Sequence, residues 1–195
     1  MTTIVDEPAA VMISDSGDSH TNTNGRPPNV VDRYFKRRYK IDVHNKVGED
    51  ALILTHSNRV CVVCLAESHP VLSEKKTVTK VSFENAKWNR LDNKFSGKNK
   101  RGAQWLDGNS PLCEVTCSDE SVYTLCCCVQ GQLIEVNENL IKHPELLTKK
   151  PCGEGYLAVL LPGLKGFDRE MRQLKSEEEY KEVLASRAAD KKMTT

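Results

Sequence analysis

Eight cysteines are the side chains with the widest range of possible chemistry in this 195-residue chain. The most suggestive spacing is Cys61-Val-Val-Cys64, a pattern that zinc sites and redox sites both use. The pair lies inside an unbroken β-prone run, and residues three apart on a strand point to opposite faces of the sheet. No second pair at this spacing and no histidine pair at zinc-finger spacing accompanies it. We therefore predict structural thiols and no metal site.

The other cysteines lead to the same interpretation. Cys113 and Cys117 share one face of an expected strand but lie ~13 Å apart at ~3.3 Å per residue, too far for a disulfide. The three consecutive cysteines at 126–128 are expected to alternate between faces. The longest apolar run near the start, residues 9–13, follows two acidic residues and a proline, which is not an export signal. Free thiols in a reducing compartment are therefore expected.

Three histidines beside turn residues invite an acid–base interpretation: His56, His69 and His143. No serine or cysteine nucleophile motif accompanies them, and the chain has no glycine-rich phosphate loop. We interpret them as loop-capping or surface side chains. These histidines therefore do not indicate an active site, and no cofactor is expected.

Basic residues are concentrated in two stretches, although the net charge of the chain is only +1. Residues 74–102 have nine basic and three acidic side chains, and residues 31–46 have six and two. Such stretches suit an acidic protein surface or RNA phosphates, and the alternative is a solvated surface that balances acid elsewhere. Partner-binding residues are expected in the glycine-flanked loop tip (Lys98, Lys100, Arg101) and in the N-terminal arm (Arg33, Arg37, Arg38). The run at 36–40 also has the composition of a nuclear-import patch.

Short strands are the main elements that must position these residues. Runs of β-prone residues between turn signals predict strands at 51–55, 59–66, 78–83, 112–116, 121–126, 132–136 and 155–161. Residues 31–40 fit either a short helix or an extended arm. Asn137 is expected to cap a short helix that ends at His143. Ser176 and Glu179 form a capping box, and the helix that follows places Tyr180, Val183, Leu184 and Arg187 on one face.

The chain divides into one domain with two tails. Residues 1–30 are rich in Ser, Asn, Gly and Asp and have almost nothing to bury after Ile13, so we expect them to be disordered. We expect the folded domain at 31–187 and a frayed tail at 188–195. No apolar run approaches the ~18 residues that a membrane span requires.

Residues 111–185 resemble the glycine-cleavage-system H-protein family. The residues that carry the resemblance are Gly131-Gln-Leu-Ile-Glu-Val-Asn-Glu-Asn-Leu140, His143-Pro144, Gly155-Tyr-Leu-Ala158 and Ser176-Glu-Glu-Glu-Tyr180. The resemblance implies a mostly β, single-hybrid, lipoyl-like barrel-sandwich fold with an added C-terminal helix.

One departure from the H-protein pattern bears directly on function. In that family a lysine at a β-hairpin tip carries the lipoyl arm, and the matching position here is Glu120. No lysine occurs between Arg101 and Lys142. A lipoyl amide needs a primary amine, so we predict that the fold is kept and the carrier chemistry is lost.

The chain from Val31 onward resembles a narrower family, the Abitram or Simiate proteins. The residues that carry this resemblance include Val31-Asp-Arg-Tyr-Phe35, His56-Ser-Asn-Arg59, Leu65-Ala-Glu-Ser-His-Pro-Val-Leu72, Lys100-Arg-Gly-Ala-Gln104 and Glu135-Val-Asn-Glu-Asn139. The resemblance implies a non-enzymatic protein that binds actin and regulates its polymerisation in filopodia, dendrites and other cell projections. It also implies a transcription-associated role in the nucleus, including nuclear speckles.

Two other classes of function stay open at this point. One is a non-lipoylated, H-protein-like adaptor that docks onto lipoyl-handling enzymes. The other is a small RNA-binding module that uses the basic loop at 74–102. The loss of the hairpin lysine argues against a carrier, and the scarcity of aromatic residues near the loop argues against RNA stacking.

Overall fold

The structure is a computed structural model that describes residues 30–94, 97 and 102–193. Its strands are β1 Phe35–Lys40, β2 Ala51–His56, β3 Cys61–Leu65, β4 Val78–Ser82, β5 Trp105–Leu106, β6 Pro111–Cys117, β7 Val122–Cys126, β8 Gly131–Val136 and β9 Ala158–Leu161. Its helices are α1 Val30–Tyr34, α2 Pro70–Ser73, α3 Asn139–Lys142, α4 Leu146–Lys149, α5 Phe167–Arg172 and α6 Glu177–Met193, and a 3-10 turn, η1, spans Val43–Asn45. The mostly β class predicted from the sequence is confirmed.

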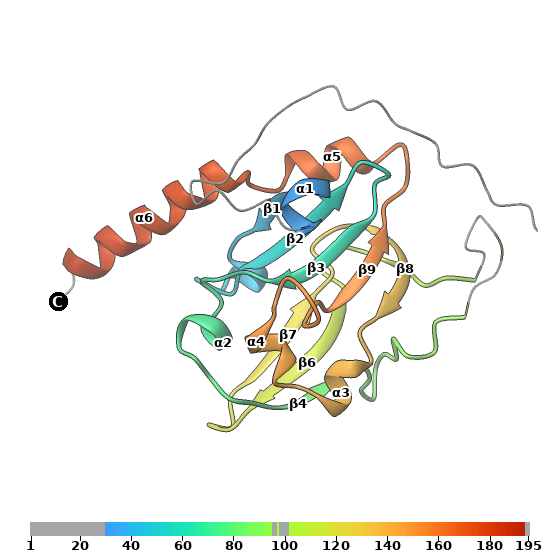
Figure 1. Cartoon of the computed structure of the whole chain (residues 1–195), viewed down its shortest axis with the longest axis horizontal. Helices are drawn as coiled ribbons and strands as arrows, with labels where there is room; N and C mark the ends of the chain where they lie inside the picture. The colour runs from blue at the N-terminus through green and yellow to red at the C-terminus, as the bar shows by residue number, and fades with distance from the viewer. Residues whose placement is uncertain (1–29, 95–96, 98–101, 194–195) are drawn as a thin grey trace, which may run out of the picture.

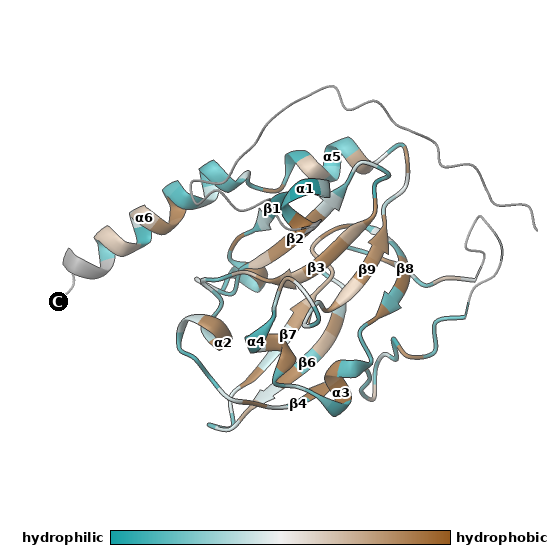
Figure 2. Cartoon of the chain, viewed as in Figure 1, coloured by the Kyte–Doolittle hydropathy of each residue, from teal (hydrophilic) through white to brown (hydrophobic). Residues whose placement is uncertain are grey.

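Two antiparallel sheets enclose the main core (Figure 1). The larger sheet has the order β1-β2-β3-β9-β8-β5, and the smaller sheet has the order β4-β6-β7. Fully buried side chains from both sheets meet between them, among them Ile53, Val63, Val115 and Leu160. Figure 2 shows the hydrophobic residues gathered on these strands. Burial of this apolar surface is the main favourable contribution to folding.

A second, smaller cluster covers the outer face of the larger sheet. Tyr39, Leu52 and Leu54 contribute to it from β1 and β2, and Tyr180 contributes from α6. The rings of Tyr39 and Tyr180 are stacked with centroids 3.9 Å apart. Alternate residues of β2 therefore serve two cores, because successive side chains on a strand point to opposite faces.

The C-terminal helix begins with the predicted capping box. The Ser176 N–H donates to Glu179 Oε2 at 2.7 Å, and the Glu179 N–H donates to Ser176 Oγ at 3.2 Å. Two donors at the helix start are satisfied in this way. The helix continues to Met193 and projects from the domain (Figure 1). It therefore runs past Arg187, where the sequence analysis expected a frayed tail.

Two details differ from what the sequence predicted, and one alternative that it left open is resolved. Asn137 does not cap α3, because its Nδ2 donates to the carbonyl oxygens of Glu154 and Tyr156 at 2.7 and 2.8 Å. The cysteines at 126–128 do not alternate between faces, because β7 ends at Cys126 and all three thiols enter the main core. The stretch at 31–40 is both of the expected alternatives, since α1 leads directly into β1.

The sequence did not predict several of the short elements. They are β5, η1, α2, α4 and α5. The N-terminal stretch at 1–29, for which we expect disorder, lies outside the described residues. Among the residues that are described, no helix combines the length and the hydropathy that a membrane-spanning segment requires.

Candidate interaction surface

The hairpin between β6 and β7 corresponds to the hairpin whose tip bears the lipoyl lysine in the H-protein pattern. Its turn comprises residues 118–121, and Glu120 is exposed there with a left-handed backbone, at φ +64°. The carboxylate of Asp119 accepts the Ser121 N–H at 3.1 Å and fixes the turn. The tip of the hairpin therefore presents a carboxylate at position 120, where carrier chemistry needs an amine.

An amine from a different segment reaches the same hairpin. The ammonium of Lys76 pairs with Asp119 at 2.5 Å and with Glu74 at 3.2 Å, and it lies 5.8 Å from the ring centroid of Tyr123. The hydrogen bond with Asp119 raises the pKa of Lys76, which keeps the amine cationic. The sequence alone does not single out Lys76, because nothing in its pattern links two segments 43 residues apart.

The three arginines expected in the N-terminal arm do not form one surface. The guanidinium of Arg33 lies 6.0 Å from the ring centroid of Tyr34. Arg37 Nη2 donates to Asp32 Oδ1 at 2.9 Å, on the face of β1 that also carries Tyr39. Arg38 is the next residue of the strand and points to the opposite face. The structure thus separates Arg38 from Arg37, with which the sequence grouped it.

Lys98, Lys100 and Arg101 lie outside the described residues, but the ends of their loop are well fixed. The Gln104 N–H donates to Asn93 Oδ1 at 2.9 Å, and Asn93 Nδ2 donates to the Leu133 carbonyl at 2.8 Å. Arg90 also donates to Gln104 Oε1 at 2.8 Å. These bonds tie both ends of the loop to β8, so the structure places the base of the basic loop beside the edge of the larger sheet.

The histidine interpretation holds for all three residues, although one of them is also deeply buried. His56 Nδ1 accepts the Asn58 N–H at 3.3 Å, and His143 is exposed. His69 Nδ1 accepts the Val71 N–H at 3.3 Å and caps α2, but its side chain lies inside the protein and its Nε2 has no hydrogen-bond partner. Burial lowers the pKa of His69 to about 4.

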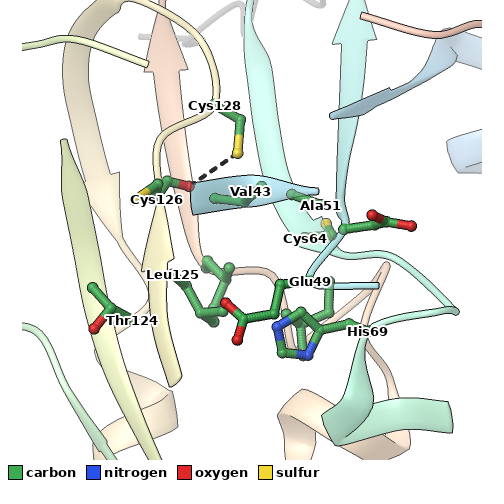
Figure 3. Close-up of a pocket in the computed structure, with 12 residues that line it drawn as sticks. Val43, Glu49, Ala51, Cys64, His69, Thr124, Leu125, Cys126 and Cys128 are labelled. Carbon is green, nitrogen blue, oxygen red and sulfur yellow. Dashed lines mark hydrogen bonds between the residues drawn. The ribbon is translucent and has the colours of Figure 1, made fainter. Parts of the chain in front are cut away.

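A cavity of about 10 Å³ adjoins His69 (Figure 3). Glu49 and Cys126 also line it, and Cys126 Sγ lies 3.1 Å from Nε2 of His44. This cysteine–histidine pair resembles a catalytic dyad in composition only, because burial raises the pKa of the thiol to about 11. The thiol is therefore protonated at neutral pH, and the pair does not supply a nucleophile.

The Cys-x-x-Cys pair is divided between the two cores. Cys61 packs in the main core and Cys64 in the outer cluster, on opposite faces of β3. Burial raises the pKa of Cys61 to about 12 and raises that of Cys64 further. Among the described residues no group of three or more potential metal ligands comes together.

Comparison with known proteins finds two kinds of similarity, one to a fold and one to a narrower family. Residues 99–187 match the glycine cleavage H-protein family. A crystal structure of a glycine cleavage system H protein from Mycobacterium marinum has a TM-score of 0.52 and 17% identity, with 77% of this chain and 97% of that chain covered. At this identity the likeness shows the fold alone.

The similarity to proteins named Protein Abitram is much higher. The Xenopus tropicalis protein is 51% identical, over 83% of this chain and 89% of its own length. The Homo sapiens protein is 49% identical, over 82% and 89%. The Dictyostelium discoideum protein is 35% identical, over 77% and 85%. Each of these alignments covers more than three quarters of this chain.

Proposed function

The chain belongs to the Abitram family, and we propose that it is a non-enzymatic actin-binding protein that regulates actin polymerisation. In this proposal it acts in the cytoplasm at actin-rich cell projections and also has a transcription-associated role in the nucleus, including nuclear speckles. Identity of 51% over most of both chains is the observation that carries the proposal.

The geometry of the domain supports a binding role over catalysis. The hairpin that corresponds to the carrier position presents Glu120, and the nearby amine of Lys76 is held in ion pairs. The cysteine–histidine pair beside the cavity is protonated at its thiol. The fold places the basic strand β1 at one edge of the larger sheet and the base of the basic loop near the other edge. Basic segments at the edges of a sheet suit association with an acidic partner.

Actin co-sedimentation tests the proposal. The purified chain should pellet with filaments at low salt, and less of it should pellet at physiological salt, because charges at an interface rim act mainly on association and are screened. Reversal of Lys98, Lys100 and Arg101 to glutamate should weaken the binding further. A matched variant should bind as the wild type does when it reverses three exposed lysines elsewhere: Lys142, Lys149 and Lys165. A chain that stays in the supernatant at every salt concentration contradicts the proposal.

The H-protein match favours one second candidate, an adaptor for lipoyl-handling enzymes. Affinity capture from cell extract separates the two functions. Recovery of lipoyl-handling enzymes without actin supports the adaptor. A parallel capture after ribonuclease treatment shows whether RNA mediates any of the interactions.

A further inference from the structure

Strand β1 carries three basic side chains on one face and aromatic side chains on the other. Pairing with β2 places Lys36 opposite Thr55, Arg38 opposite Ile53 and Lys40 opposite Ala51. Directly paired residues of antiparallel strands point to the same face, so the three cations share the face of Ile53. The alternate residues of β1 pack on the other face, in or against the outer cluster that contains Tyr39 and Tyr180.

The three cations form a regular row at the edge of the larger sheet. Because residues two apart on a strand are separated by ~6.6 Å, their charges repeat at about that interval. Lys36 is exposed, and Arg38 and Lys40 are partly exposed. We call Lys36, Arg38 and Lys40 the β1 ladder.

The charge of the ladder is poorly compensated within the described part of the chain. The residues opposite its members on β2 are a threonine and two apolar side chains, and none of the three cations takes part in an ion pair there. Arg38 also lowers the pKa of Glu178 and Glu179, but for each carboxyl it comes last among the causes, after hydrogen bonds and a lysine. Arg37, on the opposite face, already forms an ion pair with the carboxylate of Asp32.

We propose that the β1 ladder binds an acidic polypeptide segment of a partner protein, with carboxylates spaced to meet the row of cations. The assignment rests on the proposed function for the identity of that partner, which is actin. A protein fits better than RNA because the aromatic residues of β1, Phe35 and Tyr39, point to the opposite face. The ladder therefore offers no stacking platform for bases.

Neutralisation of the ladder tests this assignment. The variant Lys36→Gln/Arg38→Gln/Lys40→Gln removes the charge and keeps long side chains that can pack over Ile53. The matched control replaces Lys142, Lys149 and Lys165 with glutamine. Three probes are used with the full chain: actin filaments, a fluorescent polyglutamate peptide and a single-stranded RNA oligonucleotide.

We expect the ladder variant to bind filaments and peptide at least tenfold more weakly than the wild type at low salt, with an unchanged circular-dichroism spectrum. The control should bind both as the wild type does. If the triple variant misfolds, the single variants Lys36→Gln and Lys40→Gln should each weaken peptide binding severalfold.

The outcomes separate the ladder from the proposed function. Ladder-dependent peptide binding without any actin binding keeps the ladder and overturns actin as the partner. Actin binding that the ladder variant retains in full overturns the ladder and leaves the proposed function standing. Ladder-dependent binding of RNA without binding of the peptide overturns the choice of a protein partner.

Discussion

The buried side chain of His69 both caps a helix and lowers the stability of the fold through an unpaired ring nitrogen. Its Nδ1 accepts the Val71 N–H, so the neutral ring holds its proton on Nε2, which has no acceptor. The side chain is 2% exposed and meets Tyr123 edge-on, with centroids 5.2 Å apart. An unpaired buried donor costs about 1–3 kcal/mol. The cap on α2 and the ring contact offset part of that cost.

The protonation of His69 predicts a pH dependence of stability. Its pKa is about 4 in the folded protein and ordinarily 6.5, so the unfolded state binds more protons between these values. The stability that the neutral His69 ring contributes is fully present above about pH 6.5 and is lost as the pH falls toward 4. We expect urea denaturation to show a loss of about 2 kcal/mol between pH 7 and pH 5.

Two variants test whether His69 is responsible for this pH dependence. His69→Asn keeps a capping oxygen but does not titrate, so most of the pH dependence should disappear. His143→Asn, at an exposed position, should retain it. Equal stability of the wild-type protein at pH 5 and pH 7 would show that the imidazole is not held neutral.

At the scale of elements, the ion pairs of Arg187 help to hold α6 on the domain. Arg187 donates to Asp50 Oδ2 at 2.6 Å and to Asp42 Oδ1 at 2.7 Å. Tyr180 adds a hydrogen bond from its hydroxyl to Ser68 at 2.7 Å. Burial alone would raise the pKa of Asp50, but hydrogen bonds from Arg187, Ser68 and the backbone lower it. Asp50 therefore stays ionised although it is fully buried.

Removal of Arg187 should loosen the helix. Arg187→Ala leaves the buried carboxylate of Asp50 without its counter-charge, and we expect a loss of about 3 kcal/mol in the free energy of unfolding. Lys181→Ala removes an exposed pair with Glu177 on the same helix and should change stability little. Chemical denaturation monitored by near-ultraviolet circular dichroism measures both. Equal stabilities for the two variants would contradict a role for Arg187 in docking α6.

The β6–β7 hairpin predicts the absence of a lipoyl adduct. Glu120 offers no amine, and Lys76 is 15% exposed and paired with two carboxylates. After co-expression with a lipoate ligase, the intact mass should be that of the unmodified chain, and an H-protein expressed in parallel should gain the adduct. A stoichiometric adduct on Lys76 would falsify this prediction.

The elements that the sequence predicted best have strong local signals. The capping box of Ser176 and Glu179 is satisfied between neighbours in the chain, and runs of β-prone residues between turn signals identified β4 and β8. Asn137 was misassigned because a distant pair of carbonyls competes successfully for its side chain. The two residues of β5 are too few to produce a periodic pattern.

At the scale of the whole molecule, the sequence could not show which distant segments meet. Arg187 and Asp50 are 137 residues apart, and the pattern assigned Arg187 only to an apolar helix face. The β1 ladder had a usable signal, because alternation over 35–40 separates Lys36, Arg38 and Lys40 from the residues of the outer cluster. The alternation has this meaning only if residues 35–40 form a strand, and the sequence of residues 31–40 fitted a helix equally well. The fold itself was accessible through the resemblance to the H-protein family, and the structure confirms it.

The arrangement of the two cores predicts how the chain tolerates truncation. The residues that form or pack against the cores extend from Val31 to Leu184. A chain that begins at residue 30 should therefore keep the melting temperature of the full protein, because the removed segment has too few apolar residues to offset its own ordering. A chain that ends at Ser176 loses Tyr180 and Arg187 together and should melt many degrees lower. Differential scanning calorimetry compares the three chains. A drop of more than a few degrees in the first truncation would mean that residues 1–29 take part in the fold, and the domain boundary near Val31 would then have to move toward the N-terminus.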